Sequence, residues 1–129
     1  MITEETLHSV LMCSWDKDTL RPQDRDKWNE YVPSLNQCCV TALVVQDYFG
    51  GKLLRCDMTN GDHHYFNRLP SGKEVDLSKE QFLYIDDKPL YNTKATRSRS
   101  KILSYNITRQ RYEILKRRVE DKLKEIGEI

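Results

Sequence analysis

The stretch NQCCVTALVVQDYFGG, residues 36–51, opens with two adjacent cysteines and continues as an apolar run. Valine and threonine within the run also permit a strand, but a run of about a dozen residues favours a helix over 38–49. Gly50 and Gly51 behind it are a typical helix stop. Because such a helix is apolar on nearly every side, it has to lie at the centre of a core. The sequence therefore predicts a central helix with thiols in its first turn.

The start of this helix is a suitable place for a nucleophile. Ser34 and Gln37 have the spacing of a capping box, and Asn36 is an alternative cap. A thiol attacks as its thiolate, which the positive end of a helix dipole favours, and free amide groups of the first turn can hold an oxyanion. Cys38 and Cys39 lie about 100° apart around the helix, so only one of them can face a cleft. Periodicity does not choose between them, and a purely structural role as small buried residues is the alternative.

Length, composition and charge narrow the class of protein. The chain has 129 residues, of which 38% are hydrophobic and 32% charged, and this predicts one soluble domain over 1–129. The formal net charge of +1 gives no overall attraction to nucleic acid or to a membrane. The acidic start MITEETLHSVL lacks the pattern of a signal peptide, so a cytoplasmic location is expected. The four cysteines include no CxxC pair, and reduced thiols are expected.

Turn signals and periodicity predict the other elements. Asn60-Gly61 and the segment 70–72, Pro-Ser-Gly, separate short strands of an antiparallel sheet. Helices packed beside this sheet make the expected fold class α+β. In chain order we expect a helix capped by Thr3, a loop with a short helix over 14–35, the central helix, strands over 52–58, 63–69 and 73–77, an irregular basic segment over 86–105, and a charged helix over 106–127 with Ile107, Tyr112, Leu115, Val119 and Leu123 on one side; the core spans about 3–85.

A catalytic thiol needs an imidazole, and the imidazole needs an acceptor. His64 and Asp76 stand on neighbouring expected strands. A two-residue turn would place Asp76 opposite Asn67, on the wrong face for His64. A three-residue loop at 70–72 places Asp76 opposite Phe66, and Asp76 and His64 then share a face as diagonal neighbours within reach of a contact. Asn67 is a second candidate for orienting the imidazole, although strand alternation puts it on the other face.

The adjacent histidines also raise the question of a metal site. His63 and His64 would point to opposite faces of a strand, and the spacing of the cysteines and histidines is irregular. We therefore expect no metal and no cofactor.

These residues resemble the YunG-like family of small bacterial proteins, which is usually regarded as papain-like in fold. The resemblance runs from Trp15 through Phe82 and covers about two-thirds of the chain. Three positions depart from the family pattern: Asn36 stands where glycine is expected, Cys39 where a small residue is usual, and Phe66 where tryptophan is common. The matching pieces are SW at 14–15, QC at 37–38, TALVVQDYFGG at 41–51, HYFNRLPSG at 64–72, EVDL at 74–77 and QF at 81–82, with RYEILKRRV at 111–119 also similar.

The resemblance implies a cysteine-bearing helix packed on an antiparallel sheet that carries the histidine and the acid. It selects Cys38 over Cys39 as the nucleophile, His64 over His63 as the general base, and Asp76 as the orienting acid. Amide groups near the thiol, aided by Gln37, would form the oxyanion hole. The expected function is that of a cysteine hydrolase or acyltransferase acting on an amide or thioester, with a peptide or another amide as substrate.

Two other functions compete with this one. The first is a non-catalytic interaction domain on the same fold. The second is nucleic-acid binding through KATRSRSKIL, residues 94–103, and the basic side chains of 106–127. The acidic residues interleaved along that helix and the near-neutral total charge are typical of a solvated helix face, so nucleic acid is not the expected partner.

Overall fold

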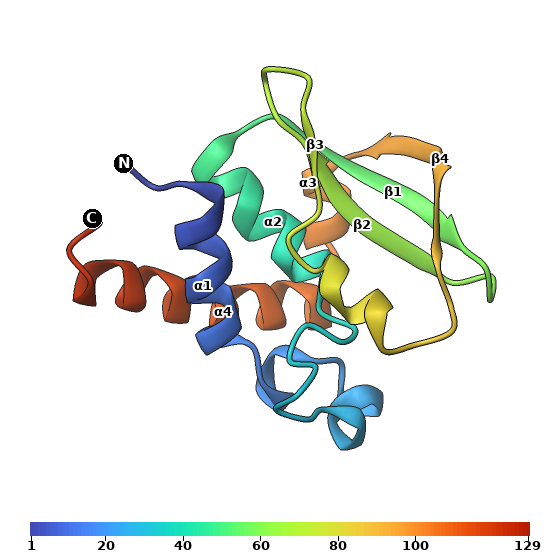
Figure 1. The fold of residues 1–129 in the computed structure, drawn as a ribbon, viewed down its shortest axis with the longest axis horizontal. Coiled ribbons are helices and arrows are strands. Elements are labelled where there is room, and N and C mark those ends of the chain that lie inside the picture. The colour runs from blue at the N-terminus through green and yellow to red at the C-terminus, as the bar shows by residue number, and fades with distance from the viewer.

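The structure, a computed structural model, describes all residues from 1 to 129. It is an α+β arrangement in which helices pack on one antiparallel sheet, as the sequence predicts, but the sheet has four strands where the sequence predicts three (Figure 1). In chain order the elements are α1 (Glu4–Ser14), the 3-10 helices η1 (Lys17–Thr19) and η2 (Pro22–Lys27), α2 (Cys38–Phe49), β1 (Lys52–Met58), β2 (His63–Arg68), β3 (Glu74–Val75), the 3-10 helix η3 (Lys79–Leu83), β4 (Pro89–Arg97), α3 (Arg99–Leu103) and α4 (Asn106–Glu125).

The central helix α2 occupies the residues that its sequence predicts. It starts at Cys38 and ends at Phe49, and Gly50 follows with φ +73°. All of its residues from Val40 to Val45 are buried. Neither predicted cap is used, because Gln37 takes the N-cap position and its side chain makes no capping hydrogen bond. The reason is that the Gln37 amide instead donates to the carbonyl of Asp16 at 3.1 Å.

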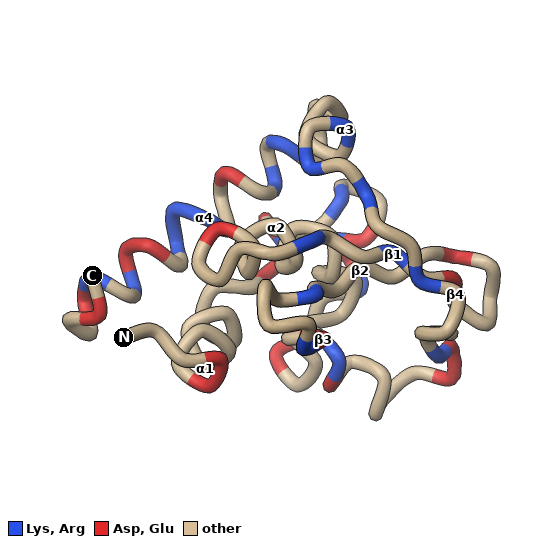
Figure 2. The backbone as a smooth tube through the Cα atoms, turned by 90° about the horizontal axis from the view of Figure 1, so that it is seen from above, with Lys and Arg blue, Asp and Glu red and all other residues tan.

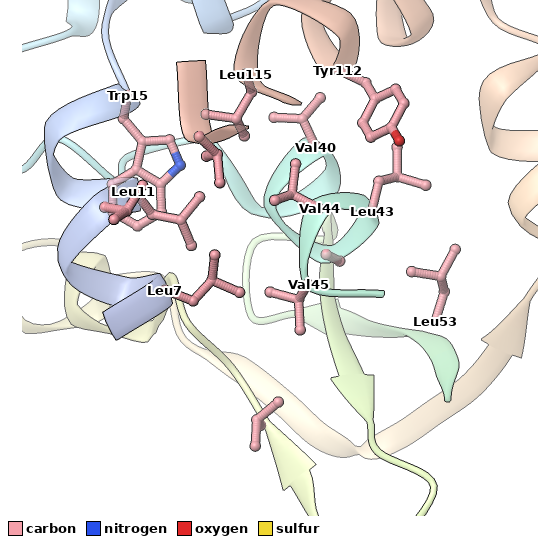
Figure 3. Packing of buried hydrophobic residues seen from close by; sticks show 14 of the residues in the cluster. Leu7, Leu11, Trp15, Val40, Leu43, Val44, Val45, Leu53, Tyr112 and Leu115 are labelled. Carbon is pink, nitrogen blue, oxygen red and sulfur yellow. The ribbon is translucent and has the colours of Figure 1, made fainter. Parts of the chain in front are cut away.

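Side chains from α1, β1 and α4 pack around α2 (Figure 3). The helix α1 begins after Thr3, whose hydroxyl caps it by accepting from the Thr6 N–H at 3.1 Å. The helix α4 packs against both α1 and α2, but its Ile107 is 49% exposed and does not join the predicted apolar side. The main cluster combines Leu7 and Leu11 from α1 and Trp15 just after it with Val40, Leu43, Val44 and Val45 from α2, Leu53 from β1, and Tyr112, Leu115, Val119 and Leu123 from α4.

The sheet has the strand order β3-β2-β1-β4, and all neighbouring strands are antiparallel. Its turn between β2 and β3 is the predicted three-residue loop: the Leu69 N–H donates to the Lys73 carbonyl at 2.8 Å, and Gly72 has φ +93°. Asn67 pairs with Val75. The same register, continued by one residue, places Asp76 opposite Phe66, as the loop length predicts. The strand β3 itself is shorter than the expected 73–77.

The segment 86–105 is not irregular, contrary to the expectation from sequence. Residues Pro89–Arg97 form β4, which pairs with β1 at the edge of the sheet, and Arg99–Leu103 form the short helix α3. The charged and small residues of this segment have a low strand propensity, so the sequence does not indicate a strand there. The strand forms because it pairs with β1, which is distant in the chain. None of the helices is both long and apolar enough to cross a membrane.

We expect Gly51→Ala to destabilise the fold strongly. Gly51 has φ +79°, and a Cβ there would lie 2.1 Å from the Arg68 carbonyl oxygen. The clash with β2 backbone adds to the cost of the left-handed conformation, so the free energy of unfolding should fall by roughly 3 kcal/mol or more. Gly61→Ala is the matched control, since Gly61 has φ +91° with open space around it, and about 1 kcal/mol is expected. Urea unfolding of both variants measures the difference; equal losses would contradict the close approach.

Candidate active site

Cys38 is the first residue of α2, at the point where the buried helix reaches the surface. It keeps partial solvent exposure. The backbone N–H groups of Cys38, Cys39 and Val40 donate to no carbonyl, and the first intrahelical bond runs from the Thr41 N–H to the Gln37 carbonyl. The thiol therefore stands beside a set of free amide donors at the positive end of the helix.

A sharp turn at Asn36 sets the direction in which α2 begins. Asn36 has φ +61° and is the one residue other than glycine with a positive φ. Asparagine is among the few side chains that tolerate this conformation, which explains how it replaces the glycine of the family pattern. Two distant side chains hold the turn: Gln81 accepts from the Asn36 N–H at 3.2 Å, and the Arg111 guanidinium donates to the Asn36 carbonyl at 3.3 Å.

His64 lies on β2 and is almost fully buried. Its Nε2 is 2.6 Å from Oδ2 of Asp76, which follows the last residue of β3. The edge of the Phe82 ring contacts the imidazole, with ring centroids 4.8 Å apart, and Phe66 stacks on it at 6.1 Å. The imidazole is thus fixed by a carboxylate within apolar surroundings, and Nδ1 is the ring nitrogen left for another partner.

That other partner is the thiol of Cys38. Burial alone would raise the pKa of Cys38, but the hydrogen bond with His64, the positive charge of its imidazole and the backbone N–H of Tyr65 outweigh burial and lower this pKa. Burial would lower the pKa of His64, whereas its hydrogen bonds with Asp76 and Cys38 raise it to about 10. Each group therefore favours the charged form of the other, the thiolate of Cys38 and the imidazolium of His64.

Cys39 and His63, the alternatives to Cys38 and His64, both lie away from the contact of His64 with Asp76. The side chain of Cys39 packs against the core cluster, and burial raises the pKa of its thiol to about 12. His63 lies on the opposite face of β2 from His64 and reaches Asp57 at 3.3 Å on the surface. The structure thus brings together Cys38, His64 and Asp76, the residues that the resemblance selects.

The two secondary residues expected from sequence lie differently. Gln37 is fully buried beside the thiol; its amide nitrogen donates to Asp16, and its Oε1 has no hydrogen-bond partner. Asn67 is not part of the site. It points to the α2 side of the sheet, where its amide donates to the Ala42 carbonyl at 2.9 Å. Its role is to tie β2 to the middle of α2.

Sequence reasoning missed three residues that support the site. Tyr91 of β4 donates its hydroxyl to Oδ2 of Asp76 at 2.7 Å, and the Ser78 N–H and hydroxyl approach Oδ1 at 3.2 and 3.3 Å. The third is Arg111, which is buried and donates to the carbonyl of Thr19 at 2.8 Å. Ser78 is close to Asp76 in the chain, so a local turn pattern could have indicated it. The positions of Tyr91 and Arg111 depend on tertiary packing, which no local pattern indicates.

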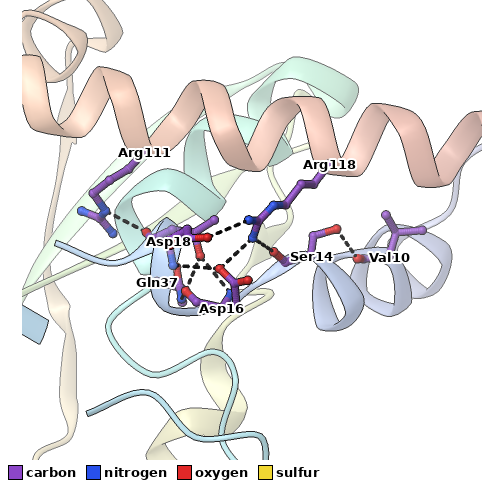
Figure 4. A network of polar contacts seen from close by, with 8 residues as sticks. Val10, Ser14, Asp16, Asp18, Gln37, Arg111 and Arg118 are labelled. Atoms are coloured by element: carbon purple, nitrogen blue, oxygen red, sulfur yellow. Dashed lines mark hydrogen bonds and ion pairs between the residues drawn. The ribbon is translucent and has the colours of Figure 1, made fainter. Parts of the chain in front are cut away.

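Arg111 is one of the basic side chains of 106–127 that a nucleic-acid surface would use. Instead it is buried, and its guanidinium donates to the carbonyls of Thr19 and Asn36. Arg118 of the same helix is also engaged, because it pairs with Asp16 at 2.7 Å and Asp18 at 3.3 Å (Figure 4). Elsewhere the acidic and basic residues alternate along α4 (Figure 2). Arg111 and Arg118 are therefore engaged within the protein and do not contribute to a basic surface for nucleic acid.

A groove of about 700 Å³ borders the acid side of the site. Its lining includes Asp76, Phe82 and Tyr91 as well as Glu5 and His8 of α1. The carboxylate that contacts His64 therefore borders the groove.

The four thiols should differ in reactivity at mildly acidic pH. At pH 6 we expect iodoacetamide to modify Cys38 first, because its thiolate is held by the imidazolium. Cys39 and Cys56 should stay unmodified, since burial raises their pKa values to about 12 and about 11. Peptide mass spectrometry at short times measures each site. Cys39→Ala should leave the fast phase unchanged and Cys38→Ala should remove it; a fast phase that survives in Cys38→Ala would contradict this geometry.

Comparison with known proteins agrees with the resemblance seen in the sequence. A family described as "YunG protein" matches residues 3–124. The chain is similar to "Uncharacterized protein YunG" of Bacillus subtilis strain 168, with 36% identity over 78 residues, which are 60% of this chain and 62% of that protein. The aligned part thus spans less than two-thirds of the relative. No solved structure matches the chain. The family match extends over nearly the whole domain, helix α4 included, and the chain therefore belongs to the YunG protein family.

Proposed function

We propose that this protein is a papain-like cysteine hydrolase or acyltransferase, with Cys38 as nucleophile, His64 as general base and acid, and Asp76 as the orienting acid. The observation that supports it most is the convergence of these three side chains, which are far apart in sequence. His64 Nε2 lies 2.6 Å from Asp76, and interaction with the same imidazole lowers the pKa of the Cys38 thiol. This is the nucleophile, base and orienter arrangement that covalent catalysis requires.

The arrangement of elements supports the papain-like part of the proposal. The nucleophile stands at the N-terminus of a buried helix, and the base and acid stand on an antiparallel sheet against which that helix packs. Fold likeness alone does not establish activity, so the proposal depends on the site rather than on the topology.

In the first half of the reaction the Cys38 thiolate attacks the carbonyl carbon of the substrate, and a carbon–sulfur bond forms as the carbonyl becomes an oxyanion. The His64 imidazolium then gives its proton to the leaving amine or thiolate as the bond to it breaks. The product that leaves is the protonated amine or thiol, and the acyl group stays on Cys38 as a thioester. Asp76 stabilises the cationic form of His64 and fixes its ring.

In the second half, neutral His64 takes a proton from water or from an acceptor amine as that molecule attacks the thioester. Collapse of the second tetrahedral intermediate expels the Cys38 thiolate, and the imidazolium is restored. Attack by water makes the protein a hydrolase, and attack by an amine makes it an acyltransferase. The free N–H groups at the start of α2 would donate to the oxyanion in both halves.

Gln37 has a supporting role in this proposal. Its amide nitrogen carries two hydrogens, and one of them is committed to the Asp16 carbonyl. The second hydrogen is available to an oxyanion beside Cys38. Because Gln37 is fully buried, this donor would be held in place without water around it.

The second candidate is a non-catalytic interaction domain. Large apolar side chains are exposed close to the groove, with Leu83 79% and Tyr84 63% exposed. Such residues suit a protein-binding surface. An interaction domain has no need of a depressed thiol pKa, however, so the reactivity of Cys38 distinguishes the two functions.

The decisive variants are His64→Ala and Asp76→Ala, with His63→Ala as the matched control. Without the imidazolium, burial leaves the pKa of Cys38 above its usual value, so labelling at pH 6.5 should fall by about 100-fold or more. Asp76→Ala should cause a loss of about tenfold, because the imidazole remains but is less basic. His63→Ala should label like the wild type, since His63 faces the surface. The measurement is the rate of labelling by a panel of electrophilic acyl and alkyl probes.

Equal labelling of the wild type and His64→Ala would show that no catalytic pair exists and would leave the interaction domain as the better function. Accumulation of a mass corresponding to the acylated protein, in the wild type and not in Cys38→Ala, would establish the covalent step directly.

A further inference from the structure

Tyr91 touches the site but has no part in the steps above. We propose that Tyr91 is a positioning residue of this site, whose hydroxyl holds Oδ2 of Asp76 against Nε2 of His64. The inference rests on the proposed function, because it assigns a role within the same Cys38–His64–Asp76 arrangement. Its basis is a pair of short contacts on one oxygen: Oδ2 of Asp76 lies 2.6 Å from His64 Nε2 and 2.7 Å from the Tyr91 hydroxyl.

Asp76 needs this support because it lies just beyond the end of β3. The strand ladder therefore does not fix its backbone, and its side chain is fixed by donors instead. Ser78 approaches Oδ1 with its N–H and its hydroxyl at 3.2 and 3.3 Å, and Tyr91 supplies the donor that Oδ2 has besides His64. With both oxygens engaged, the carboxylate cannot rotate away from the imidazole without losing a hydrogen bond.

An irregularity in β4 brings Tyr91 to this position. The register between β1 and β4 shifts between Arg55 and Asp57, so β4 carries extra residues opposite Cys56. Thr93 stabilises the irregularity, because its hydroxyl accepts from the Asp57 N–H at 2.8 Å and donates to the Leu90 carbonyl at 2.7 Å. Such bulges re-aim side chains and are frequent next to active sites. Here the bulge carries Tyr91 over the face of the sheet to Asp76, past the two strands β1 and β2 that separate β4 from β3.

The ring of Tyr91 has a second effect, on solvent. It packs edge-on against Phe66 with centroids 5.1 Å apart and against His64 at 6.2 Å, and the residue is 37% exposed along the groove. It therefore stands between groove water and the contact of His64 with Asp76. Excluding water strengthens this charged hydrogen bond.

The charges around the imidazole set the sign of the expected effect. Burial and the negative charge of Asp76 raise the pKa of Tyr91, so its hydroxyl stays a donor across the neutral range. When that hydroxyl is removed, Oδ2 turns toward groove water, the imidazolium loses stabilisation and the thiolate loses its partner. The titratable groups facing this cluster are Cys38 of α2, Cys56 of β1, Asp76 after β3, Tyr91 of β4 and, on the side of the thiols, Arg111 of α4.

The test compares Tyr91→Phe with the wild type in the pH dependence of Cys38 alkylation by iodoacetamide. The acid limb of the profile should move upward by about half to one pH unit, which is a loss of about 3- to 10-fold in rate on that limb. Tyr105→Phe is the matched control, because Tyr105 is exposed and its ring lies beside Lys101, away from the site. Asp76→Asn marks the shift expected when the acid is lost altogether.

Thermal unfolding separates positioning from a merely structural role. A lowered Tm in Tyr91→Phe with an unmoved profile would overturn the inference while leaving the proposed function intact. A wild-type profile without any reactive thiolate below pH 7 would overturn the proposed function and this inference together. An upward shift in Tyr91→Phe, smaller than that of Asp76→Asn and absent in Tyr105→Phe, supports the positioning role.

Discussion

The burial of α2 is the constraint on which the rest of the structure depends. Its residues from Val40 to Val45 are inaccessible to solvent, so the sheet has to cover one side of the helix and α1 and α4 the other. Only the two ends of the helix reach the surface, with Cys38 in the first turn and Asp47 in the last. The helix cannot shift along its axis without exposing apolar residues, and Asn67 adds a hydrogen bond from β2 to its middle. Core packing thereby fixes the place of the thiol relative to the sheet that carries His64.

In the site, burial disfavours the charged forms of Cys38 and His64, whereas hydrogen bonds and opposite charges favour them, and the second effect is larger. Removing a thiolate or an imidazolium from water is unfavourable, yet each group lies against a charge of opposite sign or a fixed donor. For His64 the partners are Asp76 and Cys38, and for Cys38 they are His64 and the Tyr65 N–H. A pair of this kind is held ready for proton transfer without reorganising solvent, because the aromatic rings of Phe66 and Phe82 enclose it.

The sequence predicted features that depend on residues close together in the chain, and it missed features that depend on distant residues. The bounds of α2 depend on a local apolar run and on Gly50, and the contact of His64 with Asp76 follows from strand alternation and a three-residue loop. Those features were correct because they are short-range. The strand β4 and its bulge arise from pairing with a distant β1, which no local pattern records, and Tyr91 was missed with them. The sequence predicts a solvated cation at Arg111, whereas the side chain is buried, because only tertiary packing determines whether a charged residue is exposed.

The bond from Arg111 to the Asn36 carbonyl has a consequence for biosynthesis. Arg111 lies 75 residues after Asn36, so the segments with Cys38 and His64 leave the ribosome before the residue that holds the turn in front of α2. A nascent chain that has not yet reached α4 lacks this contact to the turn that orients the thiol.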